Sequence, residues 1–209
     1  MRCRKCIDAN NAACSRSHRH REYGQRIRIE CIGKYGGKCV VCSEDNPKYL
    51  QLDHIANDGV DHREQLTGKR HGISNPSMYR WALKNGCPPS LQLLCANCHL
   101  TKTKQTSPGI NSPGGHRYRQ KRGLCVQQYG GKCACCGDSS SDHLHLDHVN
   151  NDGAEHRRII FRGQRSVGGL ATWALKNGCP PSLQLLCANC HQAKTFYGGC
   201  DHQTQAMVA

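Results

Sequence analysis

The chain has 209 residues, of which 37% are hydrophobic, 5% are aromatic and 17 are cysteine. Because the cysteines are counted within the hydrophobic share, few aliphatic and aromatic side chains remain, which excludes a single large enzyme core. A formal net charge of +14 indicates a polyanionic partner such as nucleic acid.

No stretch approaches the roughly 18 to 20 consecutive apolar residues of a membrane span, and the N-terminus lacks the apolar segment of a signal peptide. We therefore expect an intracellular, cytoplasmic protein that is neither secreted nor bound to a membrane. In a reducing compartment, cysteines spaced as C-x-x-C are zinc ligands more often than disulfides.

Residues 1–30 combine a cysteine and histidine cluster with a basic stretch. The ligand types of a Cys3His zinc site are present in Cys3, Cys6, Cys14 and either His18 or His20. A disordered basic tail is the alternative. The stretch Ser15–Glu30 is expected to be helical and to contact phosphate groups, as is the later stretch His116–Gly123. A solvated helix face is the alternative for both.

The rest of the chain is a tandem repeat. Trp81–His99 recurs letter for letter at Trp173–His191, 92 residues later, and Tyr35–Cys39 recurs at Tyr129–Cys133, 94 residues later. A stretch rich in Pro, Gly and Ser separates the copies and predicts a linker. We therefore divide the chain into an N-terminal segment at 1–30, a first unit at 31–105, a linker at 106–115, a second unit at 116–200 and a tail at 201–209.

Each unit is predicted to follow the order strand, insertion, strand, helix. Alternating apolar and polar residues predict strands at Tyr49–Ile55 and His143–Val149. Ser74–Gly86 has a capping residue, an early proline and a terminal glycine, which predicts a short helix. Ser90–Cys95 is then a second strand, and Ala96–Lys104 begins a further helix. The fold class is therefore α+β, built from two small units that basic helices precede.

Two C-x-x-C pairs in each unit supply the four thiolates of a tetrahedral zinc site. They are Cys39, Cys42, Cys95 and Cys98 in the first unit, and Cys133, Cys136, Cys187 and Cys190 in the second. We expect two structural zinc ions, or three if the N-terminal cluster binds one; disulfides or packed thiols are the alternative. Packed thiols are expected at Cys31, Cys87, Cys125 and Cys179. Counterparts in the other unit are lacking for Cys135 and Cys200.

Each unit also has an Asp-His pair on its first strand and a histidine directly after its last zinc cysteine. These residues are Asp53, His54 and His99 in the first unit, and Asp147, His148 and His191 in the second. A carboxylate and an imidazole can hold one divalent cation between them, which leaves the strand histidine as a general base. Surface histidines without a function are the alternative.

The succession C-x-x-C, Leu-Asp-His and LLCANCH resembles the HNH endonucleases of the ββα-metal, or His-Me finger, class. Zinc-bearing forms such as recombination endonuclease VII and the small HNH proteins of phage genomes are the most similar, which points to a bacterial or phage-infected cell. The resemblance covers both units. It implies general bases at His54 and His148 and metal ligands at Asp53, His99, Asp147 and His191.

The sequence departs from this family at one position. The middle Asn of the HNH motif, which braces the loop bearing the base, is Ser90 in the first unit and Ser182 in the second. A replacement brace is therefore expected from the repeated NDG-x-x-HR segment, at Asn57 and Asn151 or at His62 and His156.

The resemblance implies hydrolysis of DNA phosphodiester bonds with one catalytic metal ion, Mg or Mn, in each site. Flanking phosphates are expected to contact Arg63, Lys102, Arg157 and Lys194. We expect a monomer with pseudo-two-fold symmetry that makes a double-strand break in double-stranded DNA. The alternatives are a zinc-dependent nucleic-acid-binding protein that does not cut, and an enzyme in which a single working site nicks one strand.

Overall fold

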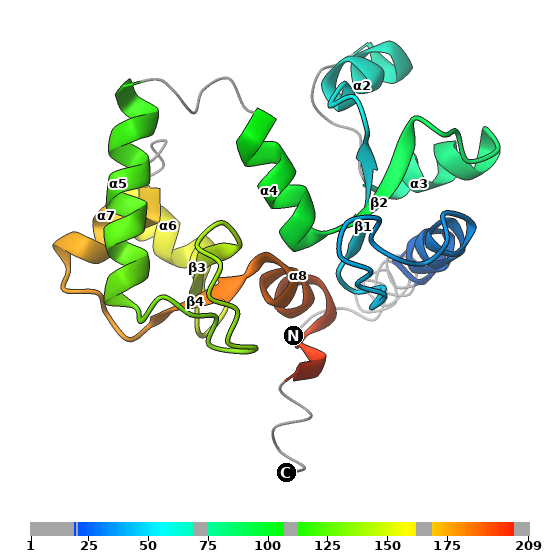
Figure 1. The fold of residues 1–209 in the computed structure, drawn as a ribbon. Helices are drawn as coiled ribbons and strands as arrows, with labels where there is room; N and C mark the ends of the chain where they lie inside the picture. Colours follow the sequence, from blue (N-terminus) through cyan, green and yellow to red (C-terminus); the bar gives the residue numbers. More distant parts are fainter. Residues whose placement is uncertain (1–18, 20, 69–74, 107–112, 162–168, 203–209) are drawn as a thin grey trace, which may run out of the picture. The chain divides into compact units, whose positions relative to one another are not determined.

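The structure is a computed structural model that describes residues 19, 21–68, 75–106, 113–161 and 169–202. It is an α+β chain with two separate two-stranded sheets (Figure 1). In these ranges no helix has the length and apolar character needed to cross a membrane. The expected N-terminal zinc ligands lie outside the described residues, namely Cys3, Cys6, Cys14 and His18 or His20.

The chain divides into two compact units, residues 1–94 and 95–209. This boundary lies before α4 (Ala96–Thr106) and not in the expected linker, because α4 packs against α8 (Ala188–Tyr197) although it belongs to the first sequence repeat. The linker is also shorter than expected at both ends. α4 ends at Thr106 and α5 begins at Pro113, so only 107–112 remain, outside the described residues.

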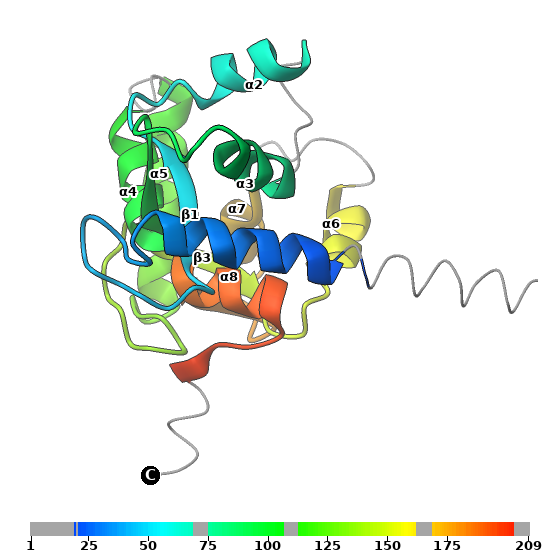
Figure 2. The ribbon, with the colours of Figure 1, turned by 90° about the vertical axis from the view of Figure 1, so that its right-hand side faces the viewer.

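The first repeat begins with a helix over residues 21–34, which is dark blue in Figure 2 and runs beside α3 (Asn75–Lys84). Between them come β1 (Leu50–His54) and α2 (Gly59–Thr67), and β2 (Leu91–Cys95) then pairs with β1. The helices and β2 bury a common core of Cys31, Tyr79, Ala82 and Leu91.

The second repeat has the same order of elements: α5 (Pro113–Gln128), β3 (Leu144–His148), α6 (Gly153–Phe161), α7 (Gly169–Lys176), β4 (Leu183–Cys187) and α8. β3 and β4 are antiparallel, with Leu144 opposite Cys187 and His148 opposite Leu183. The core uses the equivalent positions Cys125, Ala171, Ala174 and Leu183. The repeat in sequence is therefore a repeat in packing, and the strands and helices expected around each C-x-x-C pair are confirmed.

One arginine of each basic helix donates hydrogen bonds to backbone carbonyl oxygens at the start of the first strand of its repeat and just before it. Arg28 donates from Nη2 to the carbonyl oxygens of Pro47 and Leu50, at 2.5 Å each. Arg122, the equivalent residue 94 positions later, donates to the carbonyl oxygens of Ser141 and Leu144. The other cations of these helices are exposed, at Arg21, Arg26, Lys34, Arg117, Arg119 and Lys121. The predicted helical state of the basic stretches is thus confirmed where the structure describes them, and their contact with phosphate stays a prediction.

The insertion after each first strand contains a helix that the sequence analysis missed, α2 in the first repeat and α6 in the second. α2 buries none of its residues, so its sequence has no apolar stripe of helical period. The helix is preceded by an asparagine in the left-handed conformation, Asn57 with φ 61° and Asn151 with φ 60°. Asparagine tolerates this conformation, and it turns the chain from the strand into the helix.

Candidate active site and metal centres

A carboxylate and two histidines meet at the end of β3 in the second repeat. Asp147 and His148 end this strand and are only 7% and 9% exposed. Gln184, which faces Asp147 from β4, donates from Nε2 to Asp147 Oδ2 over 2.9 Å. α8 starts directly after β4, so its first turn brings His191 Nε2 to 3.6 Å from Asp147 Oδ1. The expected pair of metal ligands is therefore brought together here.

A cation already accompanies the buried carboxylate. Lys194 Nζ lies 2.5 Å from Asp147 Oδ2 and 2.5 Å from the carbonyl oxygen of His148. A buried carboxylate requires such compensation, since an isolated charge is costly to remove from water. The oxygens at Asp147 and His148 thus form a place for positive charge, which is the property that a divalent cation requires. Contact of Lys194 with a flanking phosphate stays a prediction.

The first repeat has the equivalent strand residues. Asp53 is 6% exposed, and Gln92 Nε2 donates to its Oδ2 over 2.8 Å. His99 and Lys102 lie on α4, which belongs to the other compact unit. A metal site formed by Asp53 and His99 stays a prediction.

Each strand histidine binds a second histidine eight residues later. His54 Nε2 lies 2.7 Å from His62 Nδ1, and His148 Nε2 lies 2.7 Å from His156 Nδ1. The second histidine in turn meets a tryptophan edge-on, Trp173 in the second repeat, with ring centroids 4.2 Å apart. Of the candidates for the missing brace, His62 and His156 are therefore the ones in contact with the strand histidine.

Burial lowers the pKa of His54 and His148 below the ordinary value of 6.5, and the adjacent histidine lowers it further. Nearby carboxylates act in the opposite direction, but they do not cancel this effect. An imidazole accepts a proton only when it is neutral. The environment therefore favours the form of His54 and His148 that a general base needs.

A glycine lies against each strand histidine. A methyl group on Gly153 would lie 2.8 Å from His148 Nδ1, and one on Gly59 would lie 2.9 Å from His54 Nδ1. Real Cβ contacts are longer than this, so any other residue would move the ring. Three residues of the repeated segment NDG-x-x-HR are thus explained: its asparagine makes the turn, its glycine admits the histidine ring and its histidine holds that ring.

The arginines expected to contact DNA lie on the same helices as the bracing histidines. Arg157 is exposed on α6 and donates from Nε to the carbonyl oxygen of Gly153 over 2.9 Å. Arg63 is half-buried on α2. Their contact with phosphate stays a prediction, as does that of Lys102.

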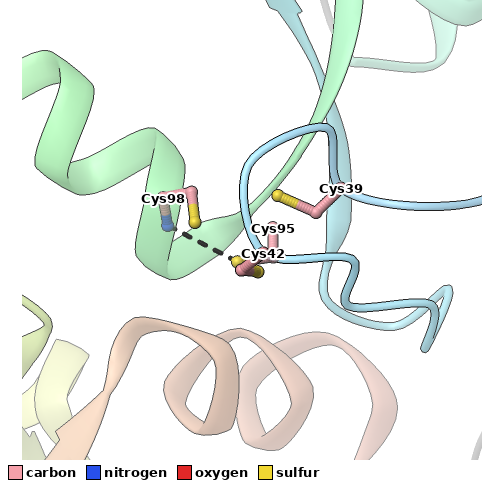
Figure 3. Close-up of side chains that lie close together, drawn as sticks. All are labelled: Cys39, Cys42, Cys95 and Cys98. Carbon is pink, nitrogen blue, oxygen red and sulfur yellow. Dashed lines mark hydrogen bonds between the residues drawn. The ribbon is translucent and has the colours of Figure 1, made fainter.

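The C-x-x-C pairs gather into two groups of four cysteines, and the ligand atoms of each group lie within 4.8 Å of one another. In Figure 3 the loop with Cys39 and Cys42 faces Cys95, at the end of β2, and Cys98 in the first turn of α4. The same arrangement is made by Cys133, Cys136, Cys187 and Cys190. None of the cysteines that the structure describes is in a disulfide. Both groups are suited to a structural zinc ion.

Backbone hydrogen bonds hold each cysteine loop in place. Val40 donates its N–H to the carbonyl oxygen of Leu93 over 3.0 Å, and Ala134 donates to that of Leu185 over 2.8 Å. Each loop is therefore fastened to the strand that leads into the other two cysteines. Of the four thiols expected to be packed, Cys31 and Cys125 are fully buried, whereas Cys87 and Cys179 are half-buried. Burial raises the pKa of Cys31 to about 12.

His145 also belongs to the site, although no motif in the sequence singled it out. Its ring stacks on that of His191, with centroids 5.7 Å apart, and burial and the charges around it lower its pKa to about 4. His145 stands two residues before Asp147, on the same face of a strand, and the alternation of residues along β3 carries this signal. The equivalent residue of the first repeat is Gln51.

In comparisons with known proteins, no family model matches the chain, and neither a curated protein nor a solved structure does. The resemblance to the HNH endonucleases therefore depends on the motifs of the sequence and on the geometry of the site.

Proposed function

We propose that the chain is a metal-dependent DNA endonuclease with two zinc-stapled HNH units, each of which hydrolyses phosphodiester bonds. One observation carries the proposal: the buried carboxylate of Asp147 and the half-exposed ring of His191 lie beside a strand histidine that a second histidine holds. A carboxylate and an imidazole at one point, next to a neutral base, are the elements of metal-assisted hydrolysis.

The roles follow from the contacts. Asp147 and His191 would hold a divalent ion, Mg²⁺ or Mn²⁺, which when bound stabilises negative charge on the phosphate and on the leaving oxygen. His148 takes the proton of the attacking water. Its Nε2 is engaged by His156, so Nδ1 is the nitrogen that accepts, and glycine at position 153 avoids the clash that a Cβ would make with Nδ1. His156 is a positioning residue.

The charge of the chain supports nucleic acid as the substrate. The formal net charge is +14, and exposed cations line the helix over residues 21–34 and α5. Phosphate contacts of this kind supply affinity without regard to base sequence.

The contact of α4 with α8 supports two sites in one monomer. Asn97 donates its N–H to Asn189 Oδ1 over 3.0 Å, and Asn189 donates its N–H to Asn97 Oδ1 over the same distance. Asn97 and Asn189 are equivalent positions of the two repeats, and reciprocal bonds between equivalent residues are the mark of a two-fold relation. This contact between the helices that carry His99 and His191 supports a pseudo-two-fold arrangement within one chain.

Supercoiled plasmid incubated with and without Mg²⁺ or Mn²⁺ tests the proposal. The wild-type chain is expected to produce linear DNA with metal and none without it. His54→Ala removes the base of the first unit and should leave an enzyme that nicks only one strand. His148→Ala removes the base of the second unit and should leave an enzyme that nicks only the other strand. End-labelling of each strand measures this. Plasmid that is bound but never cut contradicts the proposal and supports the binding protein.

A single-site nicking enzyme is the second candidate. The observation in its favour is that the two repeats differ within the site, since His145 stacks on His191 where the first repeat has Gln51. In that case one histidine variant loses all cleavage and the other keeps the wild-type rate.

Gly153→Ala combined with Gly59→Ala is expected to lower the cleavage rate about 10²-fold, the cost of displacing a reacting group by about 1 Å. The added methyl groups push His148 and His54 away from their positions. Cleavage rates and zinc content measure the effect, and zinc content should stay at the wild-type level. The matched control is Gly123→Ala on α5, where nothing lies within 4 Å of the new Cβ. A double variant with the wild-type rate contradicts the role given to these glycines.

A further inference from the structure

The second repeat contains a further group of metal-binding side chains that the duplicated motif does not include. Cys200 Sγ lies 3.4 Å from Cys190 Sγ and 3.1 Å from His202 Nδ1, and Cys190 Sγ lies 3.6 Å from His202 Nδ1. With Cys135, these residues place four ligand atoms within 4.8 Å of one another. All four belong to the compact unit of residues 95–209.

The spacing fits tetrahedral zinc. Zinc lies about 2.3 Å from sulfur and about 2.0 Å from a histidine nitrogen, so the edges of the tetrahedron measure about 3.8 Å between sulfurs and about 3.5 Å between sulfur and nitrogen. The observed separations lie near these edges. Three thiolates and one imidazole are also an ordinary ligand set of structural zinc.

Cys190 belongs to this group and to the group of Cys133, Cys136 and Cys187 as well. We propose that the second repeat binds two adjacent zinc ions, bridged by the thiolate of Cys190, with Cys135, Cys200 and His202 completing the second ion. Six thiolates and two zinc ions carry a net charge of about −2, the same as one zinc ion with four thiolates. The second ion therefore adds two cysteines to the cluster without adding charge.

The first repeat lacks this second site. Val41 stands where the second repeat has Cys135, and its side chain is 70% exposed. The position equivalent to Cys200 is Pro108. The two repeats can therefore be compared directly. The first repeat has four cysteine ligands, and the second has the equivalent four cysteines and three further ligands.

The second ion would fasten both ends of α8. Cys190 lies in the first turn of this helix, and Cys200 and His202 follow the glycine Gly198, which ends the helix with φ 77°. Cys135 lies in the loop before β3. The helix that carries His191 and Lys194 would then be linked through zinc at its start and just after its end, and both points would be linked to the loop that contains Cys135. The inference concerns metal content and does not depend on DNA cleavage.

Zinc content per chain, measured on the purified full-length protein by elemental analysis and native mass spectrometry, tests the proposal. His202→Ala, Cys135→Val and Cys200→Ser are each expected to lose one zinc ion relative to the wild type. Cys135→Val copies the first repeat, and His116→Ala on the exposed face of α5 is the control that should lose none. Because the comparison is between variants, an additional ion at the N-terminus does not affect it. Unchanged zinc content in all three variants overturns the proposal.

Two further measurements examine the bridge. Cys190→Ser is expected to lose two zinc ions, whereas Cys98→Ser, the equivalent change in the first repeat, loses one. In the wild-type chain loaded with ¹¹³Cd in place of zinc, two cadmium resonances should show coupling through the shared sulfur. This last experiment needs no variant and so does not depend on any variant folding. Cadmium resonances without coupling overturn the bridged pair.

Discussion

Removal of zinc with a strong chelator is expected to unfold the chain. The four-cysteine groups connect a loop, a strand and a helix in each repeat, and the apolar cores between the helices are small. Structural zinc contributes about 10 to 16 kcal/mol in zinc-finger peptides, which is as large as the whole stability of an ordinary domain, about 5 to 15 kcal/mol. Without the metal ions, little should remain to hold strand and helix together.

Far-UV circular dichroism recorded during chelation, together with the amount of zinc released, measures this effect. Zinc added back under reducing conditions should restore the signal. Cys187→Ser is expected to behave like the chelated protein, since Cys187 is one of the grouped thiols, and Cys179→Ser, which changes a cysteine outside the groups, is the matched control. A chain that keeps its thermal unfolding transition after complete loss of zinc contradicts the structural role of the metal.

The double variant His54→Ala with His148→Ala is expected to lose cleavage by about 10²- to 10⁴-fold, the usual contribution of a general base. Its affinity for DNA should stay close to that of the wild type, because both histidines are neutral near pH 7 and the exposed arginines and lysines remain. Binding should weaken steeply as salt is raised, in the variant and in the wild type alike.

Cleavage rates and binding at two salt concentrations, measured on the same preparations, separate these effects. Ile159→Ala, which truncates an exposed side chain on α6, is the control for a harmless change near the site. Cleavage by the double variant at the wild-type rate removes His54 and His148 from the mechanism. Loss of both cleavage and binding would show that these residues support the fold and not only the chemistry.

Much of the architecture could be predicted from the sequence because its signals are local. Alternation along Tyr49–Ile55 and His143–Val149 was sufficient for the strands, and each C-x-x-C pair brings two ligands together within four residues. The duplication strengthened these predictions, because each C-x-x-C pair and each Asp-His pair of the first repeat recurs in the second. The helix α2 was missed because it has no apolar stripe and buries none of its residues, and α6 was missed because its large apolar residues stand in one run at its end, from Ile159 to Phe161.

Only the tertiary structure decided which distant residues meet. His62 and His156 were two of several candidates to hold the base, and the choice depended on helices that the sequence did not reveal. The packing of α4 on α8 moved the boundary between the compact units away from the linker. Cys135, Cys200 and His202 had no counterpart in the other repeat, yet the loop before β3 brings Cys135 to Cys190, and the turn after α8 brings Cys200 and His202 there. Local periodicity and spacing report on neighbours along the chain, whereas these contacts arise from how whole helices pack, which no short pattern encodes.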